Sequence, residues 1–123
     1  NMSKTSSKSI QVLDEKEISL LRDFLSPEIY ESDSTAIYEG HTPHVAFILV
    51  DGEVRLVTKK NKEKLENGAV IGVRELVSES PITFNLEILQ GSQVFCLDKS
   101  TVRELLENEW LKSLFLDSVQ PVI

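Results

Sequence analysis

An Asp-Gly pair, Asp51-Gly52, stands between two runs of strand-forming residues and constrains the fold of this chain more than any other feature. The run before it is VAFILV, at residues 45–50, and the run after it is EVRLV, at residues 53–57. Asp-Gly between two such runs is a strong signal for a tight hairpin turn, because both turn positions favour positive φ. The pair therefore predicts a β-hairpin near the centre of the chain.

Short strands with turn signals between them are expected on both sides of this hairpin. Residues 36–38 form one such run, and residues 93–97 form the last. Asn67-Gly68 and Gly91-Ser92 are further turn signals. Residues 82–89 alternate between apolar and polar side chains, which is typical of a strand with one buried face. The apolar positions of that run, which are expected to face a core, are Ile82, Phe84, Leu86 and Ile88.

A helical spacing of apolar residues replaces the strand pattern at both ends of the chain. Residues 14–25 predict a short amphipathic helix, in which Asp14 and Glu17 can form a capping box. A second helix is expected up to about residue 118. Its possible caps are Asp98, Ser100 and Thr101, and Thr101-x-x-Glu104 fits a capping box. Helix, many short strands and helix is the order expected of a mainly β fold, a jelly roll or barrel, with flanking helices.

Length and charge limit the classes of function that are open to the chain. Its 123 residues suffice for one domain, which we place at residues 13–120 after a flexible head at residues 1–12. A net charge of −7 argues against nucleic acid as a partner, since phosphate contacts need clustered Lys and Arg. No apolar run reaches membrane-spanning length and no signal peptide is visible, so we expect a cytoplasmic protein without membrane contact.

The remaining reactive or clustered side chains are expected to be structural. Cys96 is the only cysteine and stands in an apolar run, where a buried thiol is the usual outcome. His41 and His44 are the only histidines, and they lack the further ligands of a metal site. No catalytic set suggests itself, so we expect neither an enzyme nor a metal protein. The basic residues of the one Lys-rich stretch, which we interpret as a solvated hairpin tip, are Lys59, Lys60, Lys62 and Lys64.

The glycines and the turns around them resemble those of one family. Glu39-Gly40, a short polar stretch, the 45–50 strand and Gly52 are spaced as in the hairpin signature of cyclic nucleotide-binding domains. Further on, Leu65-x-x-Gly68-x-x-Ile71-Gly72 resembles the family's L-x-x-G-x-x-F-G. The resemblance covers residues 14–118 and implies a cyclic nucleotide-binding-like β jelly roll (a double-stranded β-helix) with N- and C-terminal α-helices.

The ligand signature of that family is incomplete here. In members that bind cyclic AMP or cyclic GMP, F-G-E-x-x-L provides a glutamate for the ribose, and a later arginine meets the cyclic phosphate. In this chain Gly72 is followed by Val73, and Ile82 stands where that arginine would be. Phe84 replaces a small residue where the ligand needs room. The resemblance therefore implies a degenerate phosphate-binding cassette, with no cofactor expected.

An alternative uses the next two residues of the cassette. Arg74 and Glu75 lie one and two positions late, and an insertion in the loop could bring Glu75 to the ribose and Arg74 to the phosphate. A cyclic nucleotide or another small ligand then remains open, whereas the other interpretation is a surface Arg-Glu pair on a short helix. The candidate ligand-binding residues are Gly72, Val73, Arg74, Glu75, Ile82 and Thr83.

The last predicted helix carries a wide apolar stripe, which is a second candidate site. Two roles are open for this stripe: packing against the roll, or contact with a partner or a second copy. In the resembled family, the helix after the roll often carries the regulatory movement and the dimer contact. We therefore expect a non-enzymatic regulatory module that acts through a protein partner or as a homodimer. The candidate interaction residues are Trp110, Leu111, Leu114 and Phe115.

Overall fold

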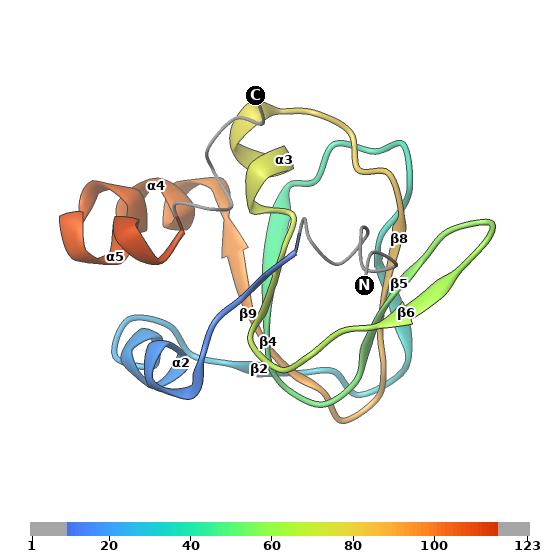
Figure 1. Ribbon diagram of the computed structural model, residues 1–123, viewed down its shortest axis with the longest axis horizontal. Coiled ribbons are helices and arrows are strands. Elements are labelled where there is room, and N and C mark those ends of the chain that lie inside the picture. The colour runs from blue at the N-terminus through green and yellow to red at the C-terminus, as the bar shows by residue number, and fades with distance from the viewer. Residues whose placement is uncertain (1–9, 116–123) are drawn as a thin grey trace, which may run out of the picture.

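Two antiparallel sheets form the body of the protein in the computed structural model, which describes residues 10–115 except for the Trp110 side chain. The first sheet has five strands, in the order β1 (Gln11–Val12), β7 (Ala69–Ile71), β4 (Val45–Asp51), β9 (Gln93–Asp98) and β2 (Glu28–Ile29). The second has four, in the order β3 (Ser34–Ile37), β8 (Asn85–Ile88), β5 (Val54–Val57) and β6 (Lys62–Lys64). Figure 1 shows the strands curving into a roll, with most of the helices gathered on one side of it.

The helices cover one face of the five-stranded sheet. On the left in Figure 1 lie α2 (Glu15–Leu21), α4 (Lys99–Glu107) and α5 (Glu109–Leu114), and α3 (Val73–Ser78) lies at the top of the roll. Buried side chains of all four helices form one apolar cluster, the helix-side cluster, with side chains of β4, β7 and β9. A second cluster, the inter-sheet cluster, fills the space between the two sheets. The fold therefore has three layers: helices, the five-stranded sheet and the four-stranded sheet.

Strand β4 lies between the two clusters, which explains its unbroken apolar sequence. Ala46 and Ile48 belong to the helix-side cluster, whereas Phe47 and Leu49 belong to the inter-sheet cluster. Successive side chains of a strand point to opposite faces, so a strand that is covered on both faces needs an apolar residue at every position. Its longest pairing is with β9, a strand that follows more than forty residues later in the chain.

The hairpin predicted at Asp51-Gly52 is wrong, because β4 and β5 belong to different sheets. The turn carries the chain from one sheet to the other, and of the two residues Gly52 alone has positive φ (131°). A Cβ on Gly52 would lie 2.6 Å from Ser92 Cα, so the close approach of a second turn requires glycine here. The buried Ser92 hydroxyl fastens the two turns: its Oγ accepts from the Glu53 N–H (3.0 Å) and donates to the Glu53 carbonyl oxygen (3.0 Å).

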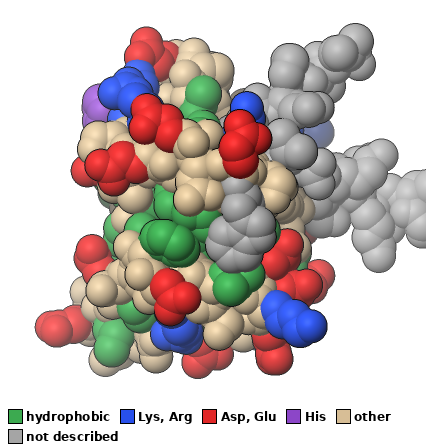
Figure 2. Space-filling model, turned by 90° about the vertical axis from the view of Figure 1, so that its left-hand side faces the viewer, with side chains coloured by type: hydrophobic (Ala, Val, Ile, Leu, Met, Phe, Trp, Pro, Cys, Tyr) green, Lys and Arg blue, Asp and Glu red, His purple; other side chains and the backbone are tan. Residues whose placement is uncertain are grey.

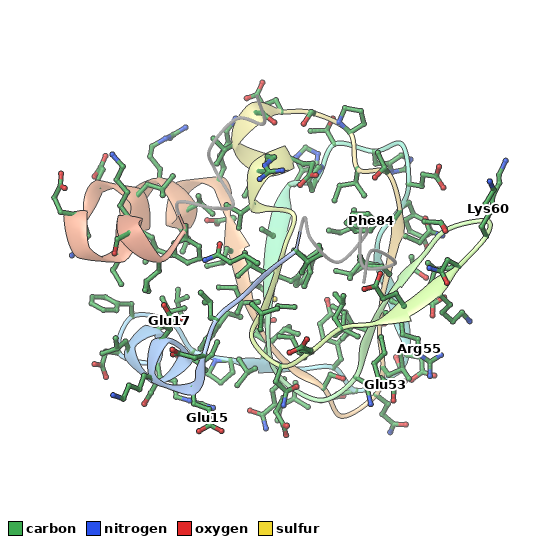
Figure 3. The ribbon with its side chains drawn as sticks, in the orientation of Figure 1. Glu15, Glu17, Glu53, Arg55, Lys60 and Phe84 are labelled. Carbon is green, nitrogen blue, oxygen red and sulfur yellow. The ribbon has the colours of Figure 1, made fainter. Side chains whose placement is uncertain are left out.

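The hairpin of this region lies one strand later, where β5 and β6 pair in antiparallel register. The Thr58 N–H donates to the Asn61 carbonyl oxygen (2.8 Å) and closes the tip. Lys60 stands at the end of this hairpin, which projects from the roll in Figures 1 and 3. All four lysines of the stretch are exposed, so the predicted solvated tip is confirmed.

The N-terminal helix begins as predicted and ends earlier. Asp14 Oδ1 accepts from the Glu17 N–H (2.8 Å) and Glu17 Oε1 accepts from the Asp14 N–H (2.9 Å), which confirms the capping box. The helix ends at Leu21 rather than at residue 25, and Phe24 beyond it is 52% exposed. Residues 11 and 12, which the sequence places in a flexible head, pair with β7 as β1, whereas residues 1–9 lie outside the described residues.

The single helix predicted at the C-terminal end is two helices. Asp98, one of the three possible caps, is the cap of α4, since its carboxylate accepts from the Thr101 N–H (2.8 Å). The predicted capping box of Thr101 and Glu104 is wrong, because Thr101 lies inside the first turn of α4. The chain leaves helical geometry at Asn108 (ψ 117°), where α4 ends. Asn108 Oδ1 then accepts from the Leu111 N–H (3.1 Å) at the start of α5. One asparagine therefore ends one helix and caps the next.

The alternating run at residues 82–89 is a strand only in its second half, β8. Ile82, Leu86 and Ile88 are buried as predicted, and Phe84 is half-buried against the same inter-sheet cluster. The predicted mainly β jelly roll with flanking helices is the observed fold. Among the described residues, no helix is both long and apolar enough to cross a membrane.

Candidate functional site

Helix α3 stands where the sequence predicts the ligand cassette, and a residue in left-handed geometry marks each of its ends. Gly72 precedes the helix with a φ of 90°, and Glu79 follows it with a φ of 58°. The Leu76 N–H donates to the Gly72 carbonyl oxygen (2.8 Å), so helical hydrogen bonding starts directly at the glycine. Positive φ is unfavourable for a residue with a Cβ, which makes Gly72 a backbone requirement. Val73 and Leu76 are buried in the helix-side cluster and anchor the helix to the body.

A cavity of about 280 Å³ lies beside α3 and brings most of the predicted ligand-binding residues together. Those that line it are Gly72, Val73, Arg74, Glu75 and Thr83. The other lining residues come from the chain start, the β5–β6 hairpin, β7 and the segment before β8: Ile10, Leu56, Thr58, Asn61, Glu63, Val70 and Phe84. The volume is close to the lower end of the range of small-molecule sites, about 300–1,000 Å³. Binding of a ligand by these residues stays a prediction.

Ile82 is the predicted site residue that the structure places elsewhere. Its side chain is 1% exposed and belongs to the inter-sheet cluster. Its backbone is held on both sides, since the Ile82 N–H donates to the His41 carbonyl oxygen (3.0 Å) and its own carbonyl oxygen accepts from the Gly40 N–H (2.8 Å). A buried aliphatic side chain offers no contact to an anion, so this position contributes to the core rather than to the cavity.

Phe84 provides an aromatic ring in the cavity lining, and Glu63 provides an acidic side chain. Figure 3 shows Phe84 on the inner side of the roll, and its half-buried side chain lines the cavity. Glu63 lines the cavity from β6, and the sequence analysis missed it because it stands inside the Lys-rich stretch. The signal was the alternation of a strand, which turns Glu63 away from Lys62 and Lys64 and toward the inside of the roll.

Three of the described residues that line the cavity are charged: Glu63, Arg74 and Glu75. They are the described side chains that could meet a charged or polar ligand in this cavity.

Helix α3 is joined to the C-terminal helices. Glu79, after α3, forms an ion pair with Lys99 at the start of α4. The hydrogen bond from Lys99, together with its charge, holds the pKa of the Glu79 carboxyl below its ordinary value. Val73 shares the helix-side cluster with Val102 and Phe115. The cavity helix therefore cannot move without disturbing the packing of α4 and α5.

The predicted interaction residues lie in and just after α5. Leu111, Leu114 and Phe115 are buried in the helix-side cluster, with exposed fractions of 2%, 9% and 3%. Packing is thus the role that these three side chains have in this conformation. Contact with a partner stays a prediction that requires α5 to move, and the side chain of Trp110 lies outside the described part of the chain.

Cys96 and the histidines are removed from this cavity. Burial raises the pKa of the Cys96 thiol to about 11, and the charge of Glu28 adds to this effect. The side chain is therefore a neutral thiol at neutral pH and a poor nucleophile. The His41 ring lies 6.0 Å from the Tyr38 ring, measured between centroids. Within residues 10–115, no group of three His, Cys, Asp or Glu side chains is placed to hold a metal ion.

Comparison with known proteins points to one family. The family model described as "Cyclic nucleotide-binding domain" matches residues 27–109, well over half of the chain. A comparison with curated proteins finds no significant match in sequence. Solved structures with the same fold are also found, and the three described below are 15%, 17% and 21% identical to this chain in sequence.

Three of these structures illustrate the fold. One comes from a cyclic-GMP-dependent signalling pathway that regulates bacterial phytopathogenesis, with a TM-score of 0.72, 15% identity, and coverage of 87% of this chain and 90% of that chain. Another is the catabolite activator protein of Thermus thermophilus (TM-score 0.63, 17% identity, 86% of this chain and 53% of that chain), so this chain spans about half of its length. The third is cAMP-bound PfPKA-R (TM-score 0.59, 21% identity, 88% of this chain and 42% of that chain). At these identities the likeness shows the fold alone.

Proposed function

The chain belongs to the cyclic nucleotide-binding domain family, and from this premise we propose that it is a regulatory module that does not hold cyclic AMP or cyclic GMP by the family's usual contacts. Domains of this family are generally regulatory rather than catalytic, which supports a non-enzymatic role. In this proposal residues 13–120 act as one domain in the cytoplasm, through contacts with a protein partner or with a second copy.

One observation supports the proposal: a cavity lies beside α3, but the sequence lacks the two ligand-contacting residues that the family has at the corresponding positions. Val73 follows Gly72 where the family has a ribose-binding glutamate, and the buried Ile82 occupies the position of the phosphate-binding arginine. A hydrogen bond to a charged group is worth about 1.5–3 kcal/mol, so the loss of both contacts weakens binding by about two to four orders of magnitude.

Isothermal titration calorimetry with cyclic AMP, cyclic GMP and cyclic dinucleotides tests the proposal. The expected result is no measurable binding at micromolar ligand concentrations. A Kd in the micromolar range for any of these ligands, at a stoichiometry of one per chain, would refute it.

A second candidate function is a true sensor that uses a shifted cassette. The observation in its favour is that Arg74 and Glu75 line the cavity side by side at the start of α3. The cAMP-bound state of PfPKA-R and the cyclic-GMP pathway of the first solved structure make cyclic nucleotides the first ligands to try. A sensor of this kind predicts that a cyclic nucleotide raises the melting temperature and that Arg74→Ala abolishes the rise.

The matched control for this second candidate is Arg103→Ala. Arg103 is exposed on α4 and does not line the cavity, so its substitution removes the same charge at a distance. A nucleotide-dependent rise that survives Arg103→Ala and is lost with Arg74→Ala supports the sensor. No rise with any cyclic nucleotide excludes it.

The proposed protein contact is assigned to the helical side of the molecule. Figure 2 shows apolar side chains near the centre of this face, with acidic side chains around them. Phe24, just beyond α2, is 52% exposed. Analytical ultracentrifugation over a range of protein concentrations tests the homodimer, and Phe24→Ser is expected to weaken it. A single monomeric species at all concentrations would exclude the homodimer and leave a different protein as the partner.

A further inference from the structure

Residues 10–12 contact both faces of the five-stranded sheet. Strand β1, which belongs to this segment, pairs with β7 at the edge of that sheet. Successive side chains of an extended chain point to opposite faces. Ile10 packs against the inter-sheet cluster and lines the cavity, whereas the Gln11 side-chain nitrogen Nε2 donates to the carbonyl oxygen of Leu114 in α5. One short segment is therefore in contact with the cavity and with the last described helix.

The hydrogen bond from Gln11 is made to the end of α5. The last four carbonyl groups of a helix have no partner within the helix, and that of Leu114 is one of them. Isolated helices shorter than about 12–15 residues are marginal in water, and α5 has six residues. It is held by burial of Leu111 and Leu114 in the helix-side cluster and by contacts to its ends. Loss of the contact with Gln11 is therefore expected to loosen α5.

The attachment of residues 10–12 is weaker than that of the residue that follows them. Leu13 is 2% exposed, belongs to the helix-side cluster, and donates its N–H to the Gly68 carbonyl oxygen (2.9 Å). In contrast, Val12 is 44% exposed, and residues 10 and 11 are only partly buried. Segments with few buried apolar contacts open locally without unfolding of the whole protein. The firmly held chain thus begins at Leu13, and residues 10–12 can open from it.

We infer that residues 10–12 form a releasable strap, a regulatory element that opens together with α5. In the closed state, which is the state of this structure, the strap forms part of the cavity wall and holds the end of α5. Its release opens the cavity beside β7 and loosens α5 in the same step. The inference rests on the proposed function, because α5 belongs to the helical side of the molecule to which the protein contact is assigned.

Hydrogen–deuterium exchange followed by mass spectrometry, on the whole chain without added ligand, tests the inference. Gln11→Ala removes the contact with α5, whereas Ile10→Ser weakens the strap on the face of the sheet that lies away from α5. Each variant is expected to raise the exchange rate of a peptide that covers α5 by about twofold to tenfold, as for the loss of one hydrogen bond or a comparable apolar contact. Exchange of β4 and β9, in the middle of the sheet, should stay unchanged.

Two matched controls remove the same side chains elsewhere. Ile29→Ser changes a 63% exposed residue of β2, at the opposite edge of the same sheet. Gln90→Ala changes an exposed residue beyond the end of β8. Both controls should leave the exchange of α5 unchanged. Circular dichroism of all four variants verifies that the fold is kept.

Three results would overturn the inference. The first is that Ile10→Ser leaves the exchange of α5 unchanged, which would make residues 10–12 an ordinary edge strand. The second is that Ile10→Ser raises the exchange of β4 and β9 as much as that of α5, which would indicate a general loss of stability. The third is that Ile29→Ser raises the exchange of α5 as much as Ile10→Ser does.

The strap and the proposed function fail in distinguishable ways, since exchange is measured without ligand and the proposed function is tested by calorimetry. Unchanged exchange of α5 in Ile10→Ser, with no binding of a cyclic nucleotide, overturns the strap and leaves the proposed function standing. Micromolar binding of a cyclic nucleotide overturns the proposed function, whether or not α5 responds to Ile10→Ser.

Discussion

The backbone of Gly68 packs against the backbone of Leu13, and Gly68→Ala is the sharpest test of this contact. Its φ is +97°, and a Cβ built on it lies 2.0 Å from the carbonyl oxygen of Leu13. The two backbones are also hydrogen-bonded, since the Leu13 N–H donates to the Gly68 carbonyl oxygen (2.9 Å). The atom in the way of the new methyl group belongs to the backbone, so no side-chain rotation can relieve the clash.

The expected loss of stability follows from these contacts. The Cβ must move from 2.0 Å to at least 3.0 Å from that oxygen, a shift of about 1 Å. Left-handed geometry costs a residue with a Cβ about 1–2 kcal/mol, and the lost hydrogen bond costs about 1 kcal/mol. Partial exposure of the buried Leu13 side chain adds about 1–2 kcal/mol. Gly68→Ala should therefore lower the free energy of unfolding by about 3–5 kcal/mol and the melting temperature by about 10–20 °C.

Urea unfolding followed by circular dichroism measures this loss, and Gly40→Ala is the control. Gly40 has nearly the same φ, +88°, but a Cβ there meets nothing within 4 Å. Its substitution carries the backbone strain alone and should cost about 1–2 kcal/mol. Equal losses in the two variants would refute the reasoning, because the contact with Leu13 would then contribute nothing to the requirement for glycine.

Four further predictions concern three single side chains. Cys96 in the folded protein should react with iodoacetamide at about pH 8 about two orders of magnitude more slowly than after unfolding, because a pKa of about 11 leaves little thiolate. Because burial raises that pKa from 9.0, the neutral thiol stabilises the folded protein below pH 9, and this stabilisation is lost as the pH rises toward 11. In urea unfolding at alkaline pH, the free energy of unfolding of Cys96→Ala should therefore fall less with pH than that of the unsubstituted protein. The hydrogen bond from the Thr101 N–H lowers the pKa of the Asp98 carboxyl, so the cap stabilises the protein above the ordinary pKa of 3.8 and this stabilisation is lost at lower pH. In melting curves taken at neutral and acidic pH, Asp98→Asn should reduce the difference in melting temperature between the two conditions. Phe84→Ala should lower the free energy of unfolding in urea by about 1–2 kcal/mol, because the ring is only half-buried; loss of a fully buried ring costs about 3–5 kcal/mol. A loss in that larger range would place the ring in the core rather than in the cavity wall.

The pattern of apolar residues predicted where strands lie in the sequence, but it did not predict which strands pair with each other. The 45–50 run is β4, and the unbroken apolar sequence reflects burial on two faces. The Asp-Gly pair correctly indicated a turn, but a turn signal is local and does not determine which strands pair. The pairing of β4 with β9 joins residues more than forty positions apart, and it depends on apolar faces that come together only in the folded roll.

The helix ends show when a local capping signal is enough to locate the end of a helix. The Asp14 capping box was found because both of its hydrogen bonds are made within four residues. The cap of α4 stayed open between Asp98, Ser100 and Thr101, because all three have suitable side chains, and the end of β9 at Asp98 decides between them. The break at Asn108 has a local cause, an asparagine that caps α5, but the apolar spacing runs through it without interruption.

The sequence predicted only those lining residues of the cavity that lie near the cassette glycine. Residues 72–75 and Thr83 were identified because they are close in sequence to the cassette glycine. Glu63 and Ile10 reach the cavity from β6 and from the start of the chain, and their place there depends on the curvature of the roll. The composition of the described lining is therefore a property of the tertiary structure, although each of its residues is ordinary in the sequence.

The residues that shape the cavity are held by packing and backbone hydrogen bonds, so the shape of the cavity does not depend on a bound cyclic nucleotide. Gly72 starts α3 by its backbone geometry, and Val73 and Leu76 hold the helix by burial in the helix-side cluster. Ile82 holds the next segment by burial and by two backbone hydrogen bonds. These residues stabilise the fold whether or not a ligand is present, since none of their interactions depends on one. A helix in the position of a phosphate cassette is thus a consequence of packing, and the ligand has to be inferred from the charged and aromatic side chains that line the cavity.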